Sequence, residues 1–379
     1  MGSIVLGGFA LVALVALALI LVGAYRRSRM PVVSGGMLLL LLIIAWVVGL
    51  PGVTALGPTS NWTDRSPHAT RFVQVAPDVR LEVLDWGGTG PPLVFLSGLQ
   101  DVAHGFDDFA PQFSDRHHVI GITRRGYGAS SQPPSGYDVV SRVADLRAVL
   151  DSLQLGRVAL VGHSIAGDEL TGFAAAYPER VSALVYLDAA YDHSDIATLL
   201  SGGPPPAGML ATDSLSPATV QAFLLRNYGM RIPEAQLRAI GRYAPGGHLI
   251  GDVTPPVIDS LMLAGVGHPD YAAVQAPALV IDAVIDSMPN VFPAWRAFDS
   301  TSYATAIRFT DALRAWASSR RQQVRRELKG AQFLELHGAN HYVFDSNTSE
   351  VTAAMRAFLA KHEQQPAVRT PPATSPPPP

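Results

Sequence analysis

Ser164 has the sequence surroundings of a serine nucleophile. It lies in VALVGHSIAGDEL, residues 158–170, where a strand-forming run is followed by a turn and then by a helix-like run. A tight strand-to-helix turn would raise its hydroxyl above the carboxyl ends of parallel strands, where ligands bind in open α/β sheets. Gly162 and Ala166, two residues to either side, are small enough to let strand and helix approach. The alternative is an ordinary helix cap, in which Ser164 accepts hydrogen bonds from the first free amides.

A serine hydroxyl needs a positioned base, and His341 is the candidate. It follows the turn Gly338–Asn340 in LHGANHYVF, after the last strand-like run, which would present it over the end of the sheet. The alternative is a surface loop histidine. His337 and His341 have the four-residue spacing of helical metal ligands, but the glycine and asparagine between them disfavour that helix. We therefore expect no metal at these histidines and no cofactor.

An acid is needed to orient the imidazole, and the sequence offers more than one. In APALVIDAVIDSMP a strand ends near Ile281, which places Asp286 in the following loop and makes it the favoured acid. Asp188, at the end of the run LVYLDA, occupies the equivalent end of the preceding strand and is the alternative. Asp282 is a weaker candidate because it belongs to the strand itself, and none of the three is excluded.

Two backbone amides could stabilise an oxyanion. Backbone N–H groups at turns are preorganised donors for the charge that develops on a carbonyl oxygen. Ile165 follows the serine at the start of a helix, and Leu99 lies in FLSGLQD, where Gly98 allows the backbone to turn. The alternative for this second segment is a generic turn after a buried strand.

The elements that must position these residues alternate between strands and helices. Helix-like patterns begin after Asp138 and near Thr348 or Ser349, both suitable caps. This alternation predicts an α/β fold with a mainly parallel, eight-stranded sheet, helices on both faces and an antiparallel hairpin at one edge. The eight strand-like runs are residues 72–76, 81–86, 93–98, 119–123, 158–163, 184–189, 278–283 and 333–338.

A long interval separates the sixth and seventh strand-like runs. Residues of about 191–275 hold Pro-rich turns and helix-like segments such as SPATVQAFLLRNYG and PEAQLRAIGRY. The interval is too long for a plain loop, so we expect a helical lid over one end of the sheet. The whole catalytic domain is then expected over residues 71–362.

The first fifty residues predict a transmembrane hairpin. Residues 4–24 and 32–50 are apolar and uncharged, and the first run is long enough to cross a bilayer as a helix. The short loop between them carries three arginines, which favours a cytoplasmic loop. We therefore expect anchoring in a lipid bilayer, with the catalytic domain facing the periplasm or cell exterior. A cleaved signal peptide fits poorly, because the apolar run is long and no positive region precedes it; buried core helices would show amphipathic stripes.

Residues 51–70 are rich in Pro, Gly, Ser and Thr and predict a linker, whereas the Pro-rich residues 363–379 predict a disordered tail.

The composition excludes several other classes of function. A net charge of -3 without long basic runs gives no footprint for nucleic acid. The absence of cysteine excludes disulfides and thiolate metal sites. Only two of the 28 basic residues are lysines, which suggests a GC-rich bacterial source and hence the bacterial cytoplasmic membrane.

Together these motifs resemble the α/β-hydrolase superfamily over about residues 71–362. The resemblance rests on the order Ser164, Asp286, His341 and on the motifs GHSIAG, SGL, TRRGYGASS at residues 123–131 and HGANH. Two positions depart from the family pattern: Ser97 stands where many members have histidine, and Ala283 replaces a common glycine. The resemblance implies hydrolysis of an ester, thioester or amide through an acyl-enzyme, with the amides of Leu99 and Ile165 as the oxyanion hole.

We therefore expect a membrane-anchored serine hydrolase that acts on a small-molecule carboxylic ester. Two alternatives stay open within the same fold: a cofactor-free haloperoxidase and a hydrolase of carbon–carbon bonds. A third alternative is a non-catalytic receptor that keeps the pocket and has lost hydrolysis. The sequence does not predict the oligomeric state.

Overall fold

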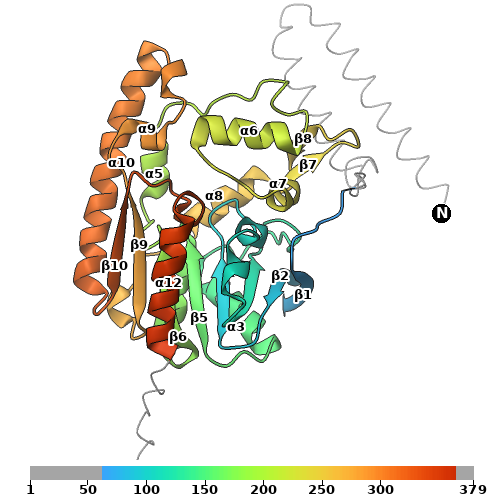
Figure 1. Ribbon diagram of the computed structural model, residues 1–379, viewed down its shortest axis with the longest axis vertical. Coiled ribbons are helices and arrows are strands. Elements are labelled where there is room, and N and C mark those ends of the chain that lie inside the picture. The colour runs from blue at the N-terminus through green and yellow to red at the C-terminus, as the bar shows by residue number, and fades with distance from the viewer. Residues whose placement is uncertain (1–61, 364–379) are drawn as a thin grey trace, which may run out of the picture. The chain divides into compact units, whose positions relative to one another are not determined.

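A mostly parallel sheet of eight strands forms the centre of the described part of the chain, residues 62–363, in the computed structural model (Figure 1). The strands lie in the order β1-β2-β4-β3-β5-β6-β9-β10. β1 and β4 run antiparallel to β2, and all other neighbours are parallel. The predicted sheet and its antiparallel edge are therefore confirmed. The strands are β1 Ala69–Ala76, β2 Val79–Gly87, β3 Pro92–Leu96, β4 His118–Thr123, β5 Val158–His163, β6 Val181–Leu187, β9 Ala278–Val284 and β10 Gln332–His337.

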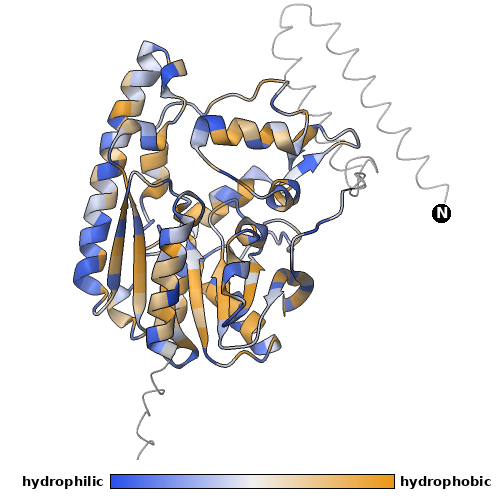
Figure 2. Ribbon diagram, in the orientation of Figure 1, coloured by the Kyte–Doolittle hydropathy of each residue, from blue (hydrophilic) through white to orange (hydrophobic). Residues whose placement is uncertain are grey.

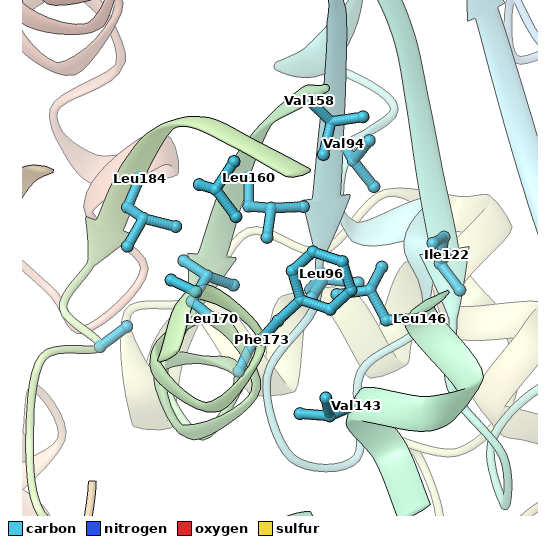
Figure 3. Packing of buried hydrophobic residues seen from close by; sticks show 14 of the residues in the cluster. Val94, Leu96, Ile122, Val143, Leu146, Val158, Leu160, Leu170, Phe173 and Leu184 are labelled. Carbon is cyan, nitrogen blue, oxygen red and sulfur yellow. The ribbon is translucent and has the colours of Figure 1, made fainter. Parts of the chain in front are cut away.

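Strand alternation divides the buried apolar side chains into two cores, one on each face of the sheet. In β3, Val94 and Leu96 pack on one face, whereas Leu93 and Phe95 pack on the other. The first face is covered by α3 (Val139–Ser152) and α4 (Ala166–Ala176), whose Phe173 lies at the centre of the cluster in Figure 3. The second face is covered by α12 (Thr348–Glu363) and by aromatic residues that follow β3. Strands covered on both faces are continuously apolar, as the sequence predicted.

Of the two helix caps expected from the sequence, the one at Asp138 forms, whereas Thr348 is the first residue of its helix and its hydroxyl donates to the carbonyls of Phe344 and Asp345. The side chain of Asp138 accepts a hydrogen bond from the backbone N–H of Ser141 and so caps α3. Capping satisfies a backbone donor that the first turn of a helix leaves free, which fixes the start of α3.

Most of the interval between β6 and β9 lies beyond one end of the sheet, above the strands in Figure 1, whereas Tyr271 near its end belongs to the core on the α3 and α4 face. Both predicted helical segments are present, and Ser216 caps the first of them in a capping box. The elements are α5 Ile196–Leu200, α6 Pro217–Tyr228, α7 Glu234–Ile240, β7 Gly241–Tyr243, β8 Leu249–Asp252, α8 Pro256–Ala264 and the 3-10 turn η4 Tyr271–Ala273.

A long helix between β9 and β10 was not predicted. α10 runs over 28 residues, Ser300–Glu327, and stands beside β10 at the edge of the sheet (Figure 1). Most of its ribbon has the colours of hydrophilic or intermediate residues in Figure 2. The remaining short elements are α9 Met288–Val291, α11 Val343–Ser346 and the 3-10 turns η1 Ala103–Phe106, η2 Ala110–Phe113, η3 Pro178–Arg180 and η5 Trp295–Ala297.

The predicted membrane hairpin lies outside the described residues. The same is true of most of the linker and nearly all of the Pro-rich tail. Within residues 62–363, no helix combines the length and the apolar character that a membrane span requires.

Candidate active site

Ser164 occupies a strained turn between β5 and α4. Its φ is +55°, a left-handed conformation that residues other than glycine rarely adopt. Its backbone N–H donates to the carbonyl of Leu187 in the neighbouring strand, and its carbonyl accepts from Gly167 at the start of α4. Such strain persists only where the surrounding structure enforces it, and it is typical of functional sites. The turn therefore holds the Ser164 hydroxyl at the carboxyl end of the sheet.

Two glycines permit the close packing around this turn. A Cβ at Gly167 would lie 1.8 Å from the carbonyl oxygen of Ala189, so α4 can approach the segment after β6 only with glycine there. A Cβ at Gly162 would lie 2.7 Å from a methyl group of Leu170 and 3.2 Å from the Cβ of Ala166. The alanine two residues after the serine thus fits, as the sequence suggested, because the closest contact is made one residue later.

His341 pairs with Asp188. Its Nδ1 lies 2.6 Å from Oδ2 of Asp188, at the end of β6. Oδ1 of the same carboxylate accepts from the hydroxyl of Tyr191 and, at 3.0 Å, from the backbone N–H of Ala283 in β9. Asp188 is 6% exposed and has a φ of +47°. The carboxylate is therefore fixed by three hydrogen bonds, while the His341 side chain remains 47% exposed.

The pairing shifts the two pKa values in opposite directions. Burial alone lowers the pKa of His341, but the hydrogen bond to Asp188 and its negative charge outweigh burial and raise that pKa above its ordinary value. Burial alone raises the pKa of Asp188, but the His341 hydrogen bond and charge, with the Tyr191 and Ala283 donors, hold that pKa below its ordinary value. Asp188 is therefore ionised over the pH range in which His341 gains its proton.

Asp286, the favoured acid of the sequence analysis, is not the partner of His341. It lies on the exposed loop after β9 and pairs at 2.9 Å with Nδ1 of His337, whose side chain is 65% exposed. The physical reason is the path of the chain after β10. Residues 338–340 carry His341 across the end of β9 to β6, where Asp188 lies, whereas His337 stays at the end of β10 beside Asp286.

Asp282 belongs to β9 and faces away from His341. It follows Val280 at the strand period of two, so its side chain lies on the α4 face, whereas Ile281 and Ala283 belong to the opposite core. Asp282 is 0% exposed, and neither carboxylate oxygen has a hydrogen-bond partner among the described residues. Burial and the nearby charge of Asp188 raise the pKa of Asp282 to about 8.

The two predicted oxyanion amides lie beside the same cavity as Ser164. Leu99 and Ile165 both line it, and within residues 62–363 no acceptor is paired with either backbone N–H. Arg124 fixes the loop that carries Leu99, because its guanidinium donates to the carbonyls of Ser97 and Gly98 at 2.6 and 2.7 Å. The same guanidinium donates to Glu169 of α4 at 3.0 Å. The TRRGYG motif thus joins the two segments that supply the amides.

A single cavity of about 470 Å³ joins these groups. Ser164, His341 and Asp188 line it together. Nε2 of His163, the residue before the serine, also lies 3.1 Å from the backbone oxygen of His341. The structure therefore places the predicted nucleophile and base on the same side of the sheet. Apart from these groups the wall is mainly apolar, with Leu99, Ile165, Ile196, Leu200, Met230, Leu263, Ile285, Val291, Phe309, Leu313, Trp316 and Ala317.

Comparison with known proteins places this geometry in a family. The α/β hydrolase fold family matches residues 91–230, the segment from β3 through the elbow to α6. The chain has the α/β-hydrolase fold. It is an enzyme of the hydrolase or esterase type.

Its relatives carry different activities. A 2-(acetamidomethylene)succinate hydrolase of Mesorhizobium japonicum is 26% identical over 203 residues, which are 51% of this chain and 70% of that protein. A non-heme chloroperoxidase of Streptomyces lividans is 37% identical over 108 residues, 28% of this chain and only 39% of that protein. A crystal structure of E-2-(acetamidomethylene)succinate hydrolase aligns with a TM-score of 0.56 at 20% identity, covering 77% of this chain and 99% of that one, and shows the fold alone.

Several residues that line this cavity were not predicted from the sequence. His193 lines the cavity, and its Nδ1 lies 3.0 Å from Asp168, a buried residue of α4. Tyr191 supports Asp188, as described above. Trp316 comes from the unpredicted α10, and its indole N–H donates to Asp195. The only available signal was the segment YDHSD directly after the sixth strand, because residues that follow parallel strands gather at one edge of the sheet.

Proposed function

We propose that this α/β-hydrolase cleaves an uncharged, medium-sized carboxylic ester through an acyl-enzyme formed on Ser164. One observation carries the proposal: a serine on a strained elbow shares a cavity with a histidine that a buried aspartate holds. That arrangement provides a nucleophile, a base and an orienting charge, which acyl transfer by serine requires.

In the proposed reaction, Ser164 Oγ attacks the ester carbonyl carbon and His341 Nε2 takes the hydroxyl proton. The backbone N–H groups of Leu99 and Ile165 donate to the oxyanion. The intermediate collapses when the C–O bond to the leaving alcohol breaks and His341 returns the proton to that alcohol. Water then attacks the acyl-enzyme with His341 as base again, and the acid leaves as Ser164 recovers its proton. Asp188 holds the imidazole tautomer and stabilises the imidazolium in both halves.

The cavity wall supports an uncharged substrate. Of the described residues that line it, none is lysine or arginine, whereas Asp101 and Asp188 both contribute negative charge. The name of the Mesorhizobium relative specifies a succinate, a dicarboxylate, and an anion of that kind would meet no cation here. Apolar side chains from the interval 191–275 and from α10 instead favour an acyl or alkyl chain, whose burial contributes about 0.8 kcal/mol per methylene.

A direct test compares the full chain with Ser164→Ala on p-nitrophenyl esters of increasing acyl length. We expect the variant to lose turnover by on the order of a millionfold, as for other serine triads, and the native chain to favour medium chains over acetate. A loss of less than about tenfold would contradict the proposed nucleophile. If the chain instead halogenates monochlorodimedone with peroxide, or cleaves a carbon–carbon substrate while leaving esters intact, the ester proposal is wrong. If the chain cleaves none of these substrates and leaves a fluorophosphonate probe unreacted, the proposal of hydrolysis is wrong and a non-catalytic receptor is the better hypothesis.

We also propose that residues 4–24 and 32–50 anchor the enzyme in the bacterial cytoplasmic membrane, with the catalytic domain outside the cytoplasm. The support is the length and uncharged character of the two runs and the three arginines between them. A reporter that is active only outside the cytoplasm, fused after residue 363, should be active. A cytoplasmic signal, or release of the chain by alkaline carbonate washing, would overturn this topology.

A further inference from the structure

A second cluster of chemically active side chains lies away from the catalytic cavity. Asp64 and His68 precede β1, and His104 belongs to η1. One donor atom from each of the three lies within 4.8 Å of the other two. Asp107, which follows η1, and Glu82 of β2 adjoin them. None of these residues lines the cavity that holds Ser164, so the proposed hydrolysis leaves the cluster without a role.

The donor separations match the dimensions of a metal site. Nε2 of His68 lies 3.3 Å from Oδ2 of Asp64, and Nδ1 of His104 lies 3.6 Å from the same oxygen. His68 Nε2 also lies 3.6 Å from Oδ1 of Asp107. Ligand bonds to Zn²⁺ of about 2.0–2.1 Å place tetrahedral ligands about 3.3–3.4 Å apart. Three separations are therefore close to ligand spacing around one ion. Nδ1 of His104 and Oδ2 of Asp107 are instead 2.9 Å apart and share a hydrogen bond, which ion binding would replace with two ligand bonds.

His68 supplies an independent indication of a missing partner. Its side chain is only 4% exposed, and Nε2 makes no hydrogen bond to any described residue although two carboxylates face it. A buried nitrogen without a partner is costly, because it has lost water and gained nothing in return. A cation between His68 Nε2 and the carboxylates of Asp64 and Asp107 removes this cost. A direct hydrogen bond does not form even at 3.3 Å from Asp64.

The surroundings provide the supports that metal ligands commonly have. Asp107 accepts from the indole N–H of Trp86 at 3.0 Å, which fixes its carboxylate. Nε2 of His104, the nitrogen that points away from the cluster, faces Glu82 at 3.9 Å, and Glu82 in turn accepts from Thr123. Histidine ligands typically have a carboxylate beside their second nitrogen, which fixes the tautomer. A groove lined by Asp64 and Asp107 gives an ion access from solvent.

We infer that Asp64, His68 and His104 bind one Zn²⁺ ion, with Asp107 at the fourth position. Two imidazoles disfavour Mg²⁺ and Ca²⁺, which prefer oxygen ligands, and suit Zn²⁺ and its transition-metal neighbours. The two carboxylates balance the ion's charge. The ion joins the segment 62–68 to η1 and to Asp107 after it, and so fastens the start of the described chain to the segment that follows β3. Its role is structural, because it lies outside the catalytic cavity.

Calorimetric titration of the chelator-treated full chain with Zn²⁺ tests the site, with Mg²⁺ as the contrasting ion. We expect one Zn²⁺ per chain and weakening of at least tenfold in His68→Gln. His118→Gln is the matched control: His118 pairs with Asp85 at 3.0 Å between β4 and β2, and among the described residues it belongs to no group of three metal-ligating side chains, so this variant should bind Zn²⁺ like the parent. No Zn²⁺ binding by the parent, equal binding in His68→Gln, or equal loss in His118→Gln would each overturn the site.

A second variant and a second readout guard against a folding failure of His68→Gln. Asp64→Asn changes a side chain that is 27% exposed, so the fold should persist while Zn²⁺ binding weakens. Zn²⁺ should also slow tryptic cleavage after the exposed Arg65 severalfold in the parent and in His118→Gln, but not in Asp64→Asn. Equal protection in Asp64→Asn, or none in the parent, would contradict the inference. Neither readout depends on ester turnover, so the site and the proposed hydrolysis fail or succeed separately.

Discussion

Two histidine–aspartate pairs, whose histidines are four residues apart in the chain, differ in distance, burial and surroundings. His337 and Asp286 meet at 2.9 Å, with side chains 65% and 49% exposed. His341 and Asp188 meet at 2.6 Å, and the aspartate side chain is only 9% exposed. The first pair lies at the rim of the sheet, whereas the second lines the cavity of Ser164. The residue types alone do not make a catalytic pair.

The difference lies in what surrounds each carboxylate. Asp188 is held by Tyr191 and by the backbone of Ala283, so its charge is fixed in direction and weakly screened. The exposed pair resembles a surface ion pair, whose charges water screens and whose stabilisation is small. Burial with several donors makes the Asp188 charge useful to an imidazolium, and the following predictions test that contrast.

The largest expected difference between the two pairs is the loss of activity when the carboxylate charge is removed. Asp188→Asn should lower kcat/KM by about 10⁴-fold, because the amide favours the wrong imidazole tautomer and cannot stabilise the imidazolium. Steady-state kinetics on the best ester measure it, with unchanged circular dichroism as the control for folding. A loss below about tenfold would remove Asp188 from the mechanism.

The pH dependence of kcat/KM distinguishes the two histidine–aspartate pairs in a second way. The base must be neutral, and Asp188 raises the pKa of His341, so kcat/KM should fall as pH drops, with a midpoint above 6.5 and a limit of tenfold per pH unit. In Asp188→Asn burial, which lowers the pKa of His341, is opposed only by the charge of Asp101, so the midpoint should move to lower pH. Asp286→Asn should leave the midpoint in place. A midpoint that moves with Asp286 would reverse the assignment.

Asp282 contributes a pH dependence of stability rather than of activity. Its folded pKa of about 8 lies above the ordinary value of 3.8, so the folded state keeps a proton that the unfolded state releases. Its contribution to stability is therefore full below about pH 4 and declines by about 1.4 kcal/mol per pH unit up to about pH 8. In Asp282→Asn this decline should vanish from urea-unfolding free energies measured between pH 5 and 8. An unchanged slope would show that Asp282 is already ionised in the folded state.

The smallest effect is expected at the exposed pair. Asp286→Asn and His337→Gln should each change kcat/KM by less than about twofold and stability by less than about 1 kcal/mol, as for most exposed ion pairs. Chemical denaturation and the same ester assay check both values. A hundredfold loss of activity in either variant would restore Asp286 as a functional acid.

The fold could be predicted from the sequence because its signals are local. Continuous apolar runs specify strands covered on both faces, and Asp138 and Ser216 mark helix starts through short-range hydrogen bonds. The elbow was also a local signal, since the small residues around Ser164 lie in one motif. The helix α10 was not predicted because most of its residues are hydrophilic or intermediate. Few of its positions are buried and apolar, so the sequence shows little helical periodicity there.

The acid could not be assigned from the sequence because the deciding contacts are long-range. Asp188 and Asp286 both follow parallel strands, and both find a histidine partner. What separates them is the path of residues 338–341 over β9 and the donors that Tyr191 and Ala283 supply, which are set by packing. Sequence spacing gives the edge of the sheet where a residue lies, but not its partner across that edge.

The most direct measurement of the central claim is the rate and position of fluorophosphonate attachment, followed by intact-mass and peptide mass spectrometry. One adduct per chain should form on the peptide that contains Ser164, at the same rate in Asp286→Asn as in the parent and at least a hundredfold more slowly in Asp188→Asn. An adduct on another residue, or equal slowing in the two aspartate variants, would contradict a nucleophile activated by His341 and the buried Asp188.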